Sequence, residues 1–540
     1  MQGRVQAREW LAVLACCAAA SIAAIVWSWQ HGAMLNYGDA LAHLHIARRV
    51  FDSRLPRLTQ LGSVWLPLPH VLLLPFVQVY SWWASGWAGV APSALAYLAA
   101  CAGVYRLARR WLQPASAALA LAFFALNPNM LYLQTTAMTE PLFVCEMVWV
   151  AVWLVEWRAC LDSDPAKAAR LQVWIAAALV AAVFTRYDGW VMALVAWVGI
   201  GLGLKRRGRL RAPLFWLASA VVVAAPVAWF VYNAVGFGDW LYFMRGPYSA
   251  KAIEMRTAAP GFPPHPGWHD PWISLLFFLK AAEMDGAAAS WGNTLLTLSL
   301  AGTAWAWVSA RRKAFLWALL LWLPVPFYAY SVSYGAVPIF LPPWWPHSWY
   351  NTRYGMEMMP AFALGLGFAA QFLLSAVREF KLGWVRYAAA ALFAVVAVDA
   401  VQMVRERPLV YVEGTKNLES RRRLEVEIPP VLRGLLAERP GGTVLMDTSV
   451  FPSLVALTGI PFRQTINESD LWIYSDALAA PAAHADLVLA FDGDEIDRAV
   501  KAHPEGLVAV RRFITKEQPA GTIYVSGTAV TTASPGQAKR

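Results

Sequence analysis

Apolar stretches long enough to form membrane-spanning helices recur along the first three quarters of the chain. A helix needs about 20 apolar residues to cross the hydrocarbon core of a bilayer. The pattern predicts eleven crossings, near residues 9–29, 91–109, 115–133, 138–157, 171–185, 188–204, 212–234, 290–309, 313–332, 352–376 and 383–404. A further apolar stretch at 65–82 contains Pro67, Pro69 and Pro75, which oppose a regular spanning helix. We predict an interfacial or re-entrant segment there, within a long first outer loop at about 30–90.

The pattern changes after residue 404, where short apolar runs alternate with helix-like stretches. The runs at 443–445, 487–491, 507–510 and 522–525 have the length and residue types of β-strands. Of the 45 basic and 34 acidic residues of the chain, 33 lie in residues 405–540. We therefore predict a mainly α protein with two domains. Residues 1–404 form a polytopic transmembrane helix bundle, and residues 405–540 form a small soluble α/β domain.

The charge distribution orients the predicted helices. Basic clusters at 106–110, 205–211, 311–313 and 378–386 each stand at the end of an apolar stretch. Positively charged loops favour the cytoplasmic side of a membrane, and alternate threading of the crossings places all four clusters there. The net charge of +11 is then a topology signal and does not indicate a nucleic-acid partner. Residues 405–540 are predicted to be extracytoplasmic, on a multi-pass protein of the bacterial inner (plasma) membrane.

Acidic residues stand at the predicted outer ends of two apolar helices. Asp39 follows a helix-breaking Asn36-Tyr37-Gly38 sequence, so it is either an N-cap or a functional carboxylate. His43 lies one turn further on the same face, but two ligands without a third are weak evidence for a metal site. Glu140 opens a membrane helix, where either the helix dipole or a functional role explains it.

Cationic and aromatic residues occur at the same predicted level of the membrane. The Arg186-Tyr187-Asp188 sequence interrupts two apolar stretches and suggests either an Arg–Asp pair in a tight turn or a substrate contact. Arg353 opens a helix, where the dipole makes a nearby anion favourable, although snorkelling to lipid headgroups is an alternative. Arg245 and Lys251, in the 235–289 loop, could bind a phosphate. Together these residues suggest an outer cavity for a substrate that is both anionic and lipid-anchored.

Several motifs in this order resemble the GT-C superfamily of polytopic glycosyltransferases, and most closely the protein O-mannosyltransferase and lipid A aminoarabinose transferase group. The motifs are Gly38-Asp39-Ala40, Leu66-Pro67-Leu68-Pro69, Leu107-Ala108-Arg109-Arg110, Met138-Thr139-Glu140-Pro141, Arg186-Tyr187-Asp188-Gly189 and Arg353-Tyr354. The resemblance implies that Asp39 is the general base for the acceptor hydroxyl, that Glu140 matches the second-loop acidic position of the catalytic site and that Arg353 binds the donor phosphate. A Trp-Trp-Asp motif is absent from the sequence, and a divalent metal is possible but not supported.

The predicted function is transfer of a hexose or pentose from a polyprenyl-phosphate donor to a hydroxyl of a lipid, glycan or protein acceptor, with inversion at the anomeric carbon. The substrate-binding set is Tyr37, His43, Arg186, Tyr187, Asp188 and Tyr354. Two alternatives belong to other classes. A lipid-linked-sugar transporter or flippase predicts internal inverted repeats and charges at mid-membrane depth, and no repeat is found. A non-catalytic envelope scaffold would use the C-terminal domain to engage its partners.

Overall fold

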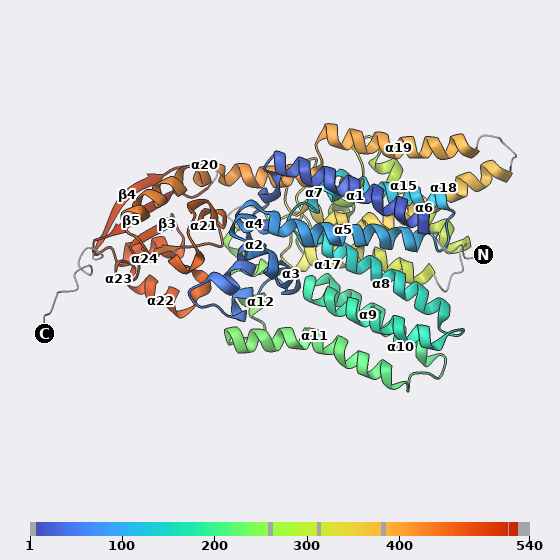
Figure 1. Cartoon of the computed structure of the whole chain (residues 1–540), viewed down its shortest axis with the longest axis horizontal. Helices are drawn as coiled ribbons and strands as arrows, with labels where there is room; N and C mark the ends of the chain where they lie inside the picture. The colour runs from blue at the N-terminus through green and yellow to red at the C-terminus, as the bar shows by residue number, and fades with distance from the viewer. Residues whose placement is uncertain (1–6, 258–262, 310–314, 380–384, 517, 528–540) are drawn as a thin grey trace. The chain divides into compact units, whose positions relative to one another are not determined.

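The computed structural model describes residues 7–257, 263–309, 315–379, 385–516 and 518–527, and Figure 1 shows their helices and strands. Contacts divide the chain into two units. The helical unit contains residues 1–32, 63–69 and 90–413, and the mixed unit contains residues 33–62, 70–89 and 414–540. Most of the predicted first outer loop thus groups with the C-terminal segment. The predicted domain boundary was residue 404, and the division in the structure follows Glu413. The basic cluster at 311–313, and most of that at 378–386, lie outside the described residues.

Within the described residues, each of the eleven predicted apolar stretches contains helix. The helices are α1 (Ala7–Gln30), α5 (Trp87–Ala108), α6 (Pro114–Ala125), α7 (Pro128–Leu133), α8 (Glu140–Cys160), α9 (Pro165–Thr185), α10 (Asp188–Lys205), α11 (Pro213–Phe237), α15 (Gly292–Ser309), η3 (Leu316–Trp322), α17 (Pro324–Tyr334), η4 (Thr352–Met358), α18 (Met359–Glu379) and α19 (Val385–Glu406). The predicted helical membrane bundle is confirmed.

Fewer helices than the eleven predicted crossings satisfy strict limits of length and hydropathy. Within the described ranges, seven segments do so: Ala7–Gln30, Trp87–Ala108, Pro165–Thr185, Asp188–Lys205, Pro213–Phe237, Leu316–Tyr334 and Thr352–Val377. The helix α8 is long enough but carries four charged residues. The helix α6 has only 12 residues and ends at its C-cap residue, Leu126. These two helices therefore miss the limits, α8 on charge and α6 on length.

The apolar stretch at 65–82 does not form one long helix. It contains α3 (Leu68–Val77) and α4 (Tyr80–Ser85), which are separated at Val79. At about 1.5 Å per residue, the ten residues of α3 reach about 15 Å, roughly half the thickness of the hydrocarbon core. Neither helix is long enough to span a membrane.

The predicted 235–289 loop contains three helices. They are α12 (Tyr242–Arg245), α13 (Ala250–Thr257) and α14 (Pro271–Gly286). The side chain of Asp270 caps α14 by accepting hydrogen bonds from the backbone N–H groups of Trp272 and Ile273, both at 3.0 Å. Phe278, Ala281 and Ala282 of α14 are fully buried. The segment at 235–289, which the sequence predicted to be an outer loop, thus includes the core helix α14.

The mixed unit contains a five-stranded sheet in the order β2-β1-β3-β5-β4. The strands are β1 (Val444–Met446), β2 (Thr465–Ile466), β3 (Leu487–Phe491), β4 (Leu507–Phe513) and β5 (Gly521–Ser526). The strand β1 runs parallel to β2 and β3, whereas β5 runs antiparallel to β3 and β4. All four strands predicted from sequence are present, and the two-residue β2 is the addition. The predicted small α/β domain is confirmed.

Helices of the C-terminal segment and of the first loop complete the mixed unit. They are α2 (Gly38–Asp52), η1 (Ala33–Leu35), η2 (Leu58–Leu61), α20 (Leu409–Ala437), which begins in the helical unit, α21 (Ser453–Thr458), η5 (Phe462–Gln464), η6 (Glu468–Asp470), α22 (Trp472–Ala479), α23 (Pro481–His484) and α24 (Glu495–Ala502). Arg54, just after α2, donates hydrogen bonds to the Thr465 carbonyl (2.8 Å) and to the Thr443 hydroxyl (2.7 Å). The first loop is thus part of the same folded unit as the sheet.

Candidate functional site

A buried carboxylate, Glu140, lies at the centre of the polar residues of the helical unit. Glu140 is the first residue of α8 and its exposed fraction is 1%. Its Oε1 accepts hydrogen bonds from Arg353 Nε (3.1 Å) and from Arg186 Nη1 (3.4 Å). Its Oε2 is buried and has no hydrogen-bond partner among the described residues. One oxygen is therefore fixed by two cations while the other can still accept a proton or a hydrogen bond.

Arg186, between α9 and α10, connects Glu140 to further polar groups. It donates to Asp188 Oδ2 through Nε (3.3 Å) and to the Tyr328 hydroxyl through Nη2 (2.7 Å), and it pairs with Glu357 at 3.2 Å. Burial alone would lower the pKa of Arg186, but Tyr328, Asp188, Glu357 and Glu140 hold that pKa well above its usual value. The Arg–Asp pair suggested by the sequence is present, and it belongs to a larger network.

Arg353 is held between two carboxylates. Its Nε contacts Glu140, and its Nη1 donates to Glu413 Oε1 at 2.7 Å. Glu413, near the start of α20, also accepts from the backbone N–H groups of Asn351 (3.0 Å) and Thr352 (2.9 Å). The anion that the sequence predicted beside Arg353 is thus supplied by the protein itself. Glu413 was missed because it lies beyond the predicted membrane domain, in a charged stretch without a motif.

Asp285, near the end of α14, is a second carboxyl group that the sequence did not reveal. It is fully buried, and within the described residues neither carboxyl oxygen has a hydrogen-bond partner. Burial raises the pKa of Asp285 well above its usual range, and the negative charges of Glu413 and Glu140 raise it further. Its backbone carbonyl accepts from the side-chain amides of Asn127 (2.8 Å) and Asn129 (3.0 Å). Asp285 is therefore a buried carboxyl group whose pKa is raised by the charges of the cluster.

Aromatic rings line the arginines of this cluster. The guanidinium carbon of Arg186 lies 5.1 Å from the ring centre of Tyr354, and that of Arg353 lies 5.3 Å from it. The Tyr354 and Tyr328 rings stack at 5.1 Å. Tyr187 has different contacts: its hydroxyl donates to the Val64 carbonyl at 2.8 Å and its ring stacks on Phe243. The structure thus brings Tyr354, but not Tyr187, to the two arginines.

The other two predicted phosphate ligands lie on the surface of the helical unit. Arg245, on α12, has a 63% exposed side chain and pairs with Asp239 at 3.6 Å. Lys251, on α13, is also exposed. Neither belongs to the buried cluster.

Asp39 lies in the mixed unit, at the second position of α2. The helix begins at Gly38 and its N-cap residue is Tyr37, so the N-cap alternative for Asp39 is wrong. Tyr37 is 2% exposed, and His43 is buried with its Nδ1 2.8 Å from Nε2 of His70. In the part of the chain that is described, no three His, Cys, Asp or Glu side chains are grouped to hold a metal ion.

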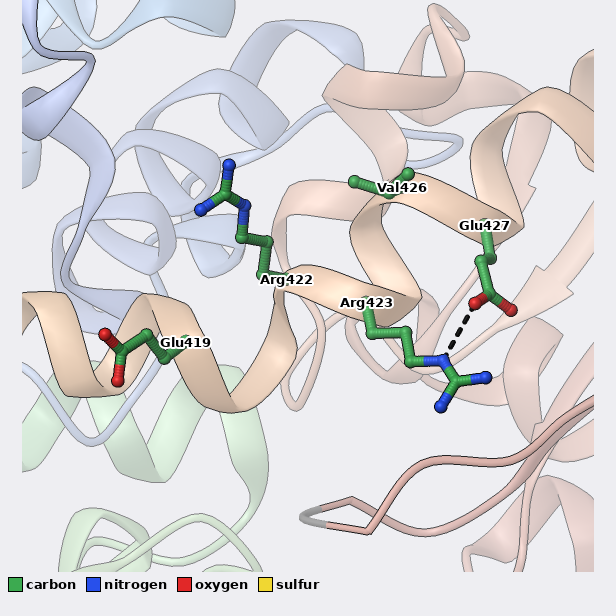
Figure 2. A pocket seen from close by; sticks show the side chains of 5 residues that line it. All are labelled: Glu419, Arg422, Arg423, Val426 and Glu427. Atoms are coloured by element: carbon green, nitrogen blue, oxygen red, sulfur yellow. Dashed lines mark hydrogen bonds and ion pairs between the residues drawn. The ribbon is translucent and has the colours of Figure 1, made fainter.

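A shallow hollow follows the outer face of α20 in the mixed unit. It is lined by Glu419, Arg422, Arg423, Val426 and Glu427, and Arg423 Nε donates to Glu427 Oε1 at 2.8 Å (Figure 2). All five residues come from one helix and none is fully buried. The hollow contains none of the candidate residues, and it provides no enclosed site.

Comparison with known proteins shows similarity at the level of structure. No protein-family model matches the sequence, and no curated protein matches it significantly. The structure of ArnT from Cupriavidus metallidurans bound to undecaprenyl phosphate has 14% sequence identity and a TM-score of 0.54, over 96% of this chain and 98% of ArnT. Its apo state gives 13% identity and the same TM-score, over 97% and 99% of the two chains. The Archaeoglobus fulgidus oligosaccharyltransferase complex with zinc and sulfate gives 13% identity and a TM-score of 0.48, over 94% of this chain and 72% of that chain. The expected fold, a helical membrane bundle followed by a small domain, is therefore confirmed, and it is similar to the fold of ArnT.

Proposed function

We propose that this protein is a membrane glycosyltransferase that uses a polyprenyl-phosphate-linked sugar as its donor. The observation that carries this proposal is the likeness, over nearly the full length of both chains, to ArnT in its undecaprenyl phosphate complex. The buried ionic cluster around Glu140 adds support. Burial of a carboxylate oxygen without a hydrogen-bond partner costs stability, and buried ionisable groups of this kind are concentrated at functional sites. The proposed acceptor is a hydroxyl of a lipid, glycan or protein at the outer face of the membrane.

The proposed reaction is a single displacement at the anomeric carbon. Asp39 removes the proton of the acceptor hydroxyl as its oxygen forms the new glycosidic bond. The bond between the anomeric carbon and the phosphate oxygen breaks, and polyprenyl phosphate leaves with the bonding electrons. One displacement inverts the anomeric configuration. General-base assistance of this kind contributes about 10²–10⁴-fold to the rate.

The donor phosphate is proposed to bind Arg353, Arg245 and Lys251. Arg353 is paired with Glu140 through Nε and with Glu413 through Nη1, so the phosphate would share this arginine with two carboxylates. Arg245 and Lys251 are exposed and can approach a phosphate without breaking a buried pair.

The test is transfer by the purified full-length protein in liposomes that contain a radiolabelled polyprenyl-phosphate sugar. We expect Asp39→Asn to lower transfer by about 10²-fold or more while donor binding persists. Asp476→Asn is the matched control, because it makes the same change at an exposed carboxylate. Near-normal transfer by Asp39→Asn would rule out Asp39 as the base. Movement of label across the bilayer without transfer would instead support the transporter alternative.

A further inference from the structure

One polar face of α20 holds the segment that leads into Asp39. Asn417 and Arg421 stand one helical turn apart on α20 and both contact residues 35–38, within the mixed unit. We propose that Asn417 and Arg421 are positioning residues for Asp39. This role depends on the proposed transferase function, and it gives the C-terminal segment a part in the reaction.

Asn417 supplies the cap that α2 lacks. The first N–H groups of a helix have no partner within the helix. The N-cap residue Tyr37 has an extended backbone and makes no side-chain cap. Instead, Oδ1 of Asn417 accepts a hydrogen bond from the Gly38 N–H at 2.7 Å. A Cβ on Gly38 would lie 3.2 Å from this oxygen, so glycine permits the close approach.

Arg421 fixes the chain just before this cap. Its Nη2 donates to the Leu35 carbonyl (2.6 Å), and its Nη1 donates to the Asn36 carbonyl (2.9 Å) and to Asn417 Oδ1 (2.7 Å). Its Nε donates to Glu425 at 2.6 Å, and its side chain is 6% exposed. A guanidinium can make all these bonds at once because its donors form a rigid fork, whereas a lysine ammonium cannot reproduce the fork.

The consequence concerns the placement of the proposed base. Asp39 directly follows the capped Gly38, so the bonds from Asn417 and Arg421 fix the backbone that carries its carboxylate. A displacement of about 1 Å at a reacting group can cost about 10²-fold in rate. The neighbouring Arg422 and Arg423 are exposed on the same helix and line the outer hollow (Figure 2). They provide controls of the same residue type in the same helix.

The experiment compares substitutions in the full-length protein in liposomes. Asn417→Leu removes the acceptor for the Gly38 N–H, Asn417→Asp retains an acceptor oxygen, and Arg421→Lys keeps the charge without the fork. We expect Asn417→Leu and Arg421→Lys to lower kcat by about 10- to 100-fold, with less than about a threefold change in KM for the donor. Asn417→Asp should recover most of the lost kcat, and Arg422→Gln and Arg423→Gln should behave as wild type.

Two outcomes would overturn this role for Asn417 and Arg421. One is wild-type kcat in Asn417→Leu, and the other is equal loss in Asn417→Leu and Asn417→Asp. Backbone amide exchange across residues 36–41 provides a readout that needs no activity, and we expect it to increase in Asn417→Leu but not in Arg423→Gln. If the wild-type protein transfers no sugar, the proposed function fails, and unchanged exchange in Asn417→Leu would separately show that α20 does not hold this segment.

Discussion

In the buried ionic cluster of the helical unit, Arg186 and Arg353 each contact more than one carboxylate. Arg353 contacts Glu140 and Glu413, and Arg186 contacts Glu140, Asp188 and Glu357. Removing one member of a buried ion pair is far more costly than replacing the pair, because the remaining charge is left without compensation. These ion pairs hold Glu140 in place, and the stability of the folded protein is therefore sensitive to the loss of either arginine.

Arg353→Ala would leave the carboxylates of Glu140 and Glu413 without their shared partner. We expect it to lower the free energy of unfolding by about 3–5 kcal/mol. Arg423→Ala, which breaks an exposed pair with Glu427, should cost less than about 1 kcal/mol. Thermal unfolding of the two variants in the same detergent measures the difference. Equal transition temperatures for them would mean that the buried cluster contributes no more than a surface pair.

Asp285 predicts a dependence of stability on pH. The pKa of Asp285 is raised in the folded protein, mainly by burial and then by Glu413 and Glu140. A raised carboxyl pKa contributes stability that is complete below the unfolded value of about 4 and is lost as the pH rises through the folded value. The Asp285→Asn substitution keeps the shape of the side chain but removes the carboxyl group that titrates.

We therefore expect the transition temperature of Asp285→Asn to rise relative to wild type as the pH increases from 6 to 9. Thermal unfolding across this pH range checks the trend. A variant that is destabilised equally at every pH would show that the Asp285 carboxyl does not titrate in this way.

At the scale of elements, helix packing depends on close approach of two backbones. Gly302 of α15 faces α18, and a Cβ there would lie 2.0 Å from the Gly365 carbonyl oxygen and 2.7 Å from the Ala369 nitrogen. These are backbone atoms, so Gly302→Ala must separate the two helices. Gly434 of α20 has no atom within 4 Å of a built Cβ, and it is also helical.

We expect Gly302→Ala to destabilise the protein by about 1–3 kcal/mol, as overpacking does. Gly434→Ala should be neutral or slightly stabilising, because alanine favours helix by about 1 kcal/mol over glycine. Thermal unfolding of both variants tests the contrast. Similar effects of the two substitutions would show that α15 and α18 tolerate a wider separation.

The elements also show what could be predicted from the sequence. Hydropathy located the apolar helices because membrane spans need long apolar runs. The Arg186–Asp188 pair was foreseeable because the two residues are neighbours. The contact between Arg353 and Glu413 joins positions 60 residues apart, and no local pattern encodes it. The core helix α14 was missed because prolines, tryptophans and histidines before it gave the whole region the composition of a loop.

For the whole molecule, the sequence predicted the helical bundle and the small α/β domain but not how the first loop is grouped. Residues 33–62 and 70–89 belong to the same unit as residues 414–540. The Arg49–Glu468 pair shows why the sequence did not reveal this: its partners are 419 residues apart, and each is also explained locally as a helix residue. Composition separates an apolar part from a polar part of a chain, but it carries no information on such long-range pairing.

This grouping sets an order of events during synthesis. A ribosome adds about 5–20 residues per second, so several hundred residues after α2 require on the order of tens of seconds. Throughout that interval the helices of the first loop have been made, but their partners in residues 414–540 have not. The mixed unit can be completed only after the last strands are released. A chain truncated before residue 414 would therefore keep its membrane helices but lose the partners that order the helix carrying Asp39. The hydrogen bonds that hold the segment leading into Asp39 can therefore form only after α20 has been synthesised.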